Sequence, residues 1–101
     1  MIFPEKSMQI CRDAVVTFGA DNQLWVLFGE IGELQDKIAD FKQGRCSIYH
    51  VAEEIADVII MLVQLTIILA CEEELNEALK YKLKRLRHKI KKVWGGSKHD
   101  H

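Results

Sequence analysis

Proline is nearly absent from this chain of 101 residues, where Pro4 is the only one. The sequence also lacks the strict alternation of apolar and polar residues that is typical of half-buried strands. The remaining turn-forming residues fall at wide intervals, which leaves room for long helices. The sequence therefore predicts an all-α fold with a single domain over residues 1–96 and a disordered tail over residues 97–101.

Cysteine is scarce, and its three copies are an odd number without metal-site spacing. They are Cys11, Cys46 and Cys71. We expect small core or boundary residues in a reduced, cytoplasmic protein. Glu5 and Lys6 interrupt the N-terminus, so we expect no signal peptide. The apolar run over residues 58–71 is too short to span a bilayer, so we expect no membrane partner.

Residues 46–79 contain no lysine or arginine, although acids stand there in an apolar setting. Glu54 and Asp57 are spaced i, i+3, and so are Glu30 and Glu33, which places each pair on one face of a helix. The face of the later pair also carries Val51, Val58, Met61 and Leu65. Acids are rarely buried unless they are paired or bind a metal. The two pairs predict a hard-cation site between two facing helices.

The first two helices are bounded by glycines. We expect one helix over residues 5–18 that stops at Gly19, and a second that is capped by Asp21 and ends at Gly44. Gly29 and Gly32 lie inside the second helix, where each costs about 1 kcal/mol relative to alanine. Two explanations stay open: close helix packing, or room for a ligand beside the first acid pair.

The third and fourth helices are separated by a weakly marked break at Ala70 and Cys71. Ser47 can cap the third helix, which is apolar nearly all round and should be central. The fourth helix should run to about Trp94 and stop at the glycines of residues 95–96. Its predicted buried stripe is Leu75, Leu79, Leu83, Leu86, Ile90 and Val93.

The acid pairs favour magnesium, because Mg²⁺ prefers carboxylate oxygens and is commonly bound together with substrate phosphates. A di-iron site would need a Glu-x-x-His motif from two helices, and neither pair has a histidine in register. Four solvated surface acids are the plain alternative. A solvated surface position accounts well for Glu53. It accounts poorly for Glu54 and Asp57, which share a helix face with apolar residues.

The fourth helix is basic: eight of the fourteen lysines and arginines fall within residues 80–92. Lys82 and Arg85 flank the apolar stripe and could approach the acids if this helix packs antiparallel to the third. A metal flanked by bases is a site for a polyphosphate. A solvated basic face is the alternative, and it suits Lys84, Arg87, Lys91 and Lys92 better.

The spacing of the motifs resembles a known family. Glu30-x-x-Glu33, twenty residues and then Glu54-x-x-Asp57 is similar to the signature of the MazG-like all-α nucleoside triphosphate pyrophosphohydrolases. The similarity extends to Gln23 and to the segment over residues 82–86, and it covers about residues 22–90. The sequence departs from the family at Gly29, where many relatives carry a further glutamate. The related phosphoribosyl-ATP pyrophosphatases often have a histidine where Met61 stands, so they rank second.

The resemblance implies a four-helix bundle that forms a homodimer or homotetramer and binds Mg²⁺, with Mn²⁺ as a substitute. The implied reaction, a housekeeping step of the nucleotide pool, converts a nucleoside triphosphate to a monophosphate and pyrophosphate. Glu30 or Glu33 would take the proton of the attacking water, and all four acids would be metal ligands. Lys82 and Arg85 would neutralise pyrophosphate, while Gln23 and Trp25 would contact the base. For Trp25, plain core packing is the alternative.

A second hypothesis belongs to another class: a non-catalytic helical interaction module that binds nucleic acid through the basic fourth helix. The acids argue against it, since without a metal they would repel phosphate. Nucleic acid is therefore not the expected partner.

Overall fold

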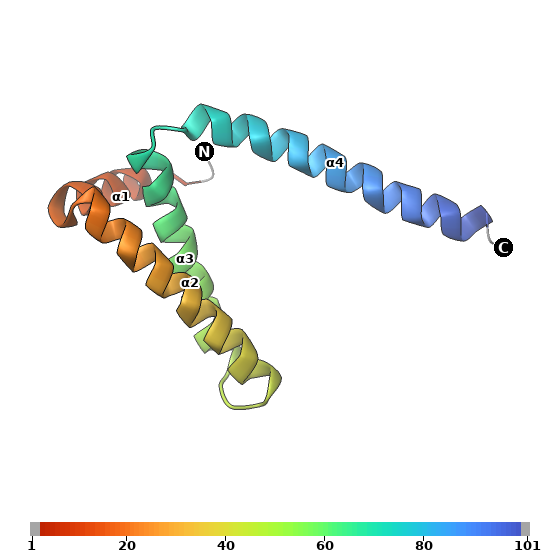
Figure 1. The fold of residues 1–101 in the computed structure, drawn as a ribbon, viewed down its shortest axis with the longest axis horizontal. Coiled ribbons are helices and arrows are strands. Elements are labelled where there is room, and N and C mark those ends of the chain that lie inside the picture. The colour runs from red at the N-terminus through yellow and green to blue at the C-terminus, as the bar shows by residue number, and fades with distance from the viewer. Residues whose placement is uncertain (1–2, 100–101) are drawn as a thin grey trace. The chain divides into compact units, whose positions relative to one another are not determined.

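The computed structural model describes residues 3–99, and it describes side chains for residues 3–95. Within these residues the chain is all-helical, with four helices and no strand, which confirms the predicted all-α class, while the oligomeric four-helix bundle stays a prediction (Figure 1). The helices are α1 (Glu5–Phe18), α2 (Ala20–Lys42), α3 (Ile48–Ile68) and α4 (Glu72–His99). The chain divides into two units, Met1–Ala70 and Cys71–His101, and each is described by itself. The single domain over residues 1–96 stays a prediction.

Gly19 separates α1 from α2, and its φ of 89° lies in the region that favours glycine. Its backbone N–H donates to the carbonyl oxygen of Val15 at 2.9 Å. The turn is tight enough for α2 to begin at Ala20, with Gly19 as its N-cap. The prediction of Asp21 as the cap is therefore wrong. Asp21 lies in the first turn of α2, where its charge still suits the helix dipole.

A Schellman motif ends α2, as the glycine in the sequence predicts. Gly44 has a φ of 73°. The N–H of Arg45 donates to the Asp40 carbonyl at 2.8 Å, and that of Gly44 donates to the Phe41 carbonyl at 3.0 Å. Ser47 is the N-cap of α3, as expected, although its hydroxyl pairs with His50 Nδ1 at 2.9 Å and makes no capping bond.

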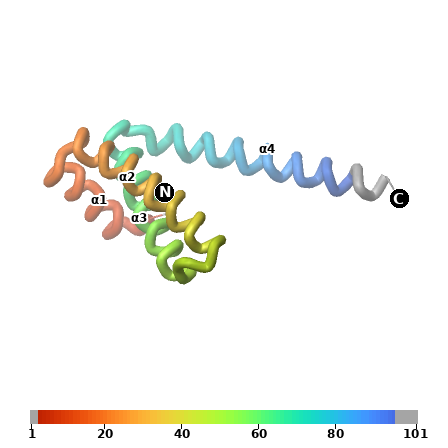
Figure 2. Tube along the Cα trace, turned by 60° about the horizontal axis from the view of Figure 1, so that its bottom comes forward, coloured from red at the N-terminus to blue at the C-terminus, as the bar shows by residue number. Residues whose placement is uncertain are grey.

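The unit Met1–Ala70 is a hairpin of α2 and α3 with α1 packed against both helices (Figures 1 and 2). The core between α1 and α3 consists of Met8, Cys11 and Val63, with Phe3 and Ile67 packed against it. Helix α3 packs against both α1 and α2, but Ile59, Ile60 and Leu62 on it are exposed, so its central place stays a prediction. Cys11 is buried and the other two cysteines are partly buried, so their core or boundary placement is confirmed.

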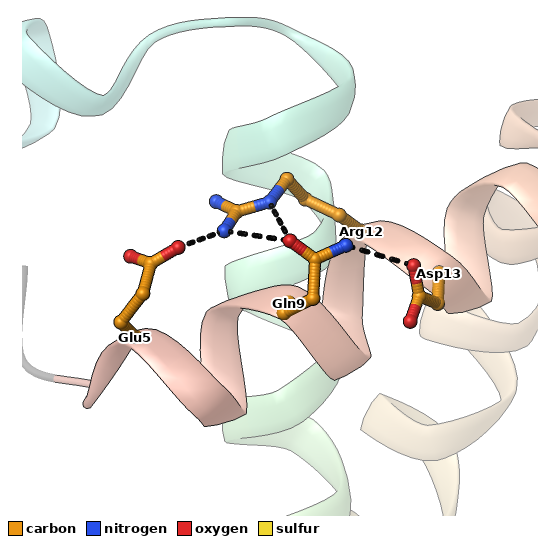
Figure 3. A network of polar contacts seen from close by, with 4 residues as sticks. All are labelled: Glu5, Gln9, Arg12 and Asp13. Carbon is orange, nitrogen blue, oxygen red and sulfur yellow. Dashed lines mark hydrogen bonds and ion pairs between the residues drawn. The ribbon is translucent and has the colours of Figure 1, made fainter.

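The outer face of α1 carries a chain of polar contacts (Figure 3). Arg12 donates to the Glu5 carboxylate and, through Nε at 3.3 Å, to the Gln9 side-chain oxygen. The Gln9 amide donates to Asp13 at 2.9 Å. Because these side chains are exposed, the network contributes little to stability.

The unit Cys71–His101 holds the single helix α4. The burial of its predicted stripe stays a prediction. In this unit taken by itself, Leu75 is half-buried, while the other members are exposed, from 38% at Leu79 to 66% at Val93. The reason is that one helix cannot bury its own apolar face. The helix also continues past residues 95–96 to His99, so the predicted stop near Trp94 is wrong. Glycine weakens a helix without forbidding one.

Candidate metal centre

Three of the four predicted metal ligands come together between α2 and α3. Glu30 from α2 and Glu54 and Asp57 from α3 each offer a carboxylate oxygen, and these atoms lie within 4.8 Å of one another. We call these three residues the acidic cluster. The turn at Gly44 folds α3 back along α2, which brings the two motifs face to face.

The acidic cluster crowds three carboxylates, of which Glu30 and Glu54 are half-buried and Asp57 is exposed. Among the described side chains, Glu54 Oε2 is the one buried polar atom that has no hydrogen-bond partner. Burial, and then the negative charges of Asp57 and Glu54, raise the pKa of Glu30. An orphaned carboxylate oxygen beside two further acids is the arrangement that a hard cation relieves.

Glu33 lies outside the acidic cluster. It stands one turn beyond Glu30 on α2, and its side chain is exposed. The i, i+3 spacing correctly places both glutamates on neighbouring turns. It cannot tell which turn faces α3, because that depends on how the two helices cross.

Two turns from the acidic cluster, a pair of glutamines bridges the same helices. Gln23 Nε2 donates to Gln64 Oε1 at 2.7 Å, and both side chains are buried. Gln64 in turn contacts the sulfur of Met61 at 3.6 Å. Gln23 was expected to contact a nucleotide base. In the structure its side-chain amide donates a hydrogen bond to Gln64 instead. The role of Gln64 was missed, although a lone glutamine within an apolar helix was a signal for it.

Open space surrounds the exposed side of α2. Trp25 is 73% exposed and makes an edge contact with Phe28, with ring centroids 5.7 Å apart, so plain core packing does not explain it. A Cβ added to Gly29 or Gly32 would meet nothing within 4 Å. Close packing among α1, α2 and α3 therefore does not account for these glycines, and room for a ligand stays a prediction.

The two predicted phosphate-binding residues lie on α4. Lys82 and Arg85 are both exposed. The Lys82 ammonium lies 5.9 Å from the centre of the Tyr81 ring, within the range of a cation–π contact. Both cations are therefore free to meet an anionic ligand. Their approach to the acidic cluster stays a prediction.

No family model, curated protein or solved structure matches this chain. The likeness to MazG-like enzymes therefore rests on the sequence motifs alone. In the part of the chain that the structure describes, no helix is both long and apolar enough to cross a membrane.

Proposed function

We propose that the protein is a Mg²⁺-dependent hydrolase that converts a nucleoside triphosphate to a nucleoside monophosphate and pyrophosphate. The observation that carries this proposal is the acidic cluster with its orphaned Glu54 oxygen. The donor set consists of carboxylates alone, without histidine or cysteine, and this set suits Mg²⁺ better than Zn²⁺.

Glu30, Glu54 and Asp57 would hold the ion, which would be needed to polarise the α-phosphate and to lower the pKa of a bound water. Glu33 is exposed one turn away from Glu30. It can therefore meet solvent and accept the proton of the attacking water, as can Glu30 when it is ionised.

The remaining predicted contacts concern the substrate's two ends. Lys82 and Arg85 would neutralise the departing pyrophosphate, and the exposed ring of Trp25 is available to stack on the base. Gln23 could reach a base only by giving up its bond to Gln64. A buried amide without a partner is costly, so Trp25 is the better candidate.

We also propose that the protein assembles into a homo-oligomer, a dimer or a tetramer, in the cytoplasm. Large apolar side chains remain exposed on α2, α3 and α4, including Phe28, Ile59 and Leu86. Exposed apolar area of this kind marks an interaction surface. Sedimentation of the purified protein tests the assembly, and a monomer at tens of micromolar would contradict it.

The experiment that tests the reaction is a pyrophosphate-release screen over canonical and modified nucleoside triphosphates with Mg²⁺. We expect release from at least one nucleotide and none after EDTA is added. Glu53→Gln is a matched control, because Glu53 is exposed beside Glu54 but lies outside the acidic cluster. Release of inorganic phosphate instead of pyrophosphate would contradict the proposed cleavage at the α-phosphate.

The basic exposed face of α4 supports one alternative, a non-catalytic module that binds nucleic acid. The two functions differ in their need for metal. A module that uses only α4 should bind nucleic acid equally well with EDTA, and it should keep this binding when the acidic cluster is neutralised.

A further inference from the structure

The contact between α2 and α3 has apolar and polar stretches. Leu27 and Met61 are buried on the facing sides of these helices, 4% and 6% exposed. Next to them lies the hydrogen-bonded pair of Gln23 and Gln64, which is equally buried. A buried amide pair in such a place needs an explanation, because an apolar pair of similar size would pack there without any hydrogen-bond requirement.

Apolar side chains alone specify helix register weakly, since one helix can slide by a turn, about 5.4 Å, and still bury apolar area. A hydrogen-bonded amide pair cannot slide in this way. After a slip of one turn both amides would be buried without partners. A single buried polar residue fixes register in coiled coils for the same reason.

The register matters to the acidic cluster because both glutamines stand two turns from its members. Gln23 and Glu30 are seven residues apart on α2, and Gln64 and Asp57 are seven residues apart on α3. Each pair therefore lies on one face of its helix. The cluster oxygens lie within 4.8 Å of one another, so a slip of about 5.4 Å would separate Glu30 from the two acids of α3.

We propose that Gln23 and Gln64 are positioning residues that set the register of α2 against α3 and so hold Glu30 next to Glu54 and Asp57. That the two glutamines set the helix register is inferred from their hydrogen bond and their burial. That this register serves metal binding rests on the proposed function. Neither glutamine touches the ion or the substrate in this role.

The test compares wild-type protein with the double variant Gln23→Leu/Gln64→Leu, which replaces the amide pair with apolar side chains and leaves no unpartnered amide. Mg²⁺ alone is titrated by calorimetry, and unfolding by urea is measured on the same samples. We expect equal or higher stability together with Mg²⁺ affinity lowered by about tenfold or more. Leu27→Met, a swap of similar volume in the same contact, should leave Mg²⁺ affinity within about twofold.

A second readout needs no metal. In metal-free protein, nuclear Overhauser contacts between α2 and α3 should form one set in the wild type. In the double variant they should form a second set displaced by a turn, or broaden. If wild-type protein binds no Mg²⁺ while the variant loses its single register, the proposed metal site is wrong but the positioning role of the two glutamines is supported. If the contacts and the Mg²⁺ affinity both match the wild type, the positioning role is wrong. Unchanged contacts with weaker Mg²⁺ binding also contradict it, because the effect would then not pass through register.

Discussion

The two units of the chain differ in charge and in packing. Met1–Ala70 has ten acidic and five basic side chains, whereas Cys71–His101 has nine basic and five acidic ones. The first unit has a core, and it half-buries Glu30 and Glu54 of the acidic cluster while Asp57 stays exposed. In the second unit, none of the side chains described, over residues 71–95, is fully buried. The first unit can thus form a site from its own residues, while the second offers a basic, apolar surface that needs something else to cover it.

The largest effect that we expect concerns the charge of the first unit. Asp57→Asn keeps the side-chain shape and removes one negative ligand, so pyrophosphate release should fall about a hundredfold or more. The metal-free protein should melt at the same or a higher temperature, because crowded carboxylates repel one another. A variant that is less stable without metal but still active would show that Asp57 is structural.

The second unit should respond through assembly. Leu86→Glu places a charge in the exposed stripe of α4, and we expect the dissociation constant of the oligomer to rise about tenfold or more. Sedimentation velocity over a dilution series measures this change. Lys84→Glu, on the polar face of the same helix, is the control. If both variants dissociate alike, charge and not the apolar stripe governs assembly.

Matched truncations compare the two units directly. Val63 is 8% exposed in the core of the first unit, and Val93 is 66% exposed on α4. Val63→Ala should lower the free energy of unfolding by about 1–3 kcal/mol. Val93→Ala should change it by less than about 0.5 kcal/mol at concentrations where the protein is monomeric. Urea denaturation measures both losses, and equal losses would mean that Val93 is buried against another part of the protein in solution.

The smallest effect concerns the open space along α2. Gly29→Ala should raise the free energy of unfolding by about 0.5–1 kcal/mol, because an added Cβ meets nothing and alanine favours a helix. Activity is measured on the same variant. If it falls while stability rises, a ligand or a partner uses this space. A loss of stability would mean instead that the space is filled in solution.

Much of this fold could be predicted from the sequence, for reasons that differ along the chain. The turns at Gly19 and Gly44 are local chemistry, and they fixed the first two helix ends to within a few residues. The two acid pairs include all three members of the acidic cluster, because i, i+3 spacing is also local.

What the sequence could not predict depends on packing. Whether Glu33 or Glu30 faces α3 depends on how the helices cross. The partner of Gln23 lies 41 residues away in the chain, so no local pattern reveals it. The stripe of α4 was assigned to a core because periodicity shows that a helix has an apolar face but does not show what covers it.

The pH dependence of the free energy of unfolding reports on the charge of Glu30 in the acidic cluster. Because the folded pKa of Glu30 is raised, the folded state holds its proton more tightly than the unfolded chain does. Its contribution to stability is therefore present below the ordinary glutamate pKa and is lost as the pH rises through the raised value. The metal-free protein should lose stability over this range, and Glu30→Gln should remove that part of the loss.

The melting temperature at pH 7 with and without Mg²⁺, for wild type and Glu54→Gln, tests the metal site most directly. Saturating Mg²⁺ should raise the wild-type melting temperature by about 5 °C or more, since a ligand at a hundred times its Kd adds about 2.7 kcal/mol. In Glu54→Gln, which neutralises the side chain bearing the orphaned oxygen, the shift should vanish. An unchanged wild-type melting temperature, or an equal shift in both proteins, would contradict a metal centre at Glu30, Glu54 and Asp57.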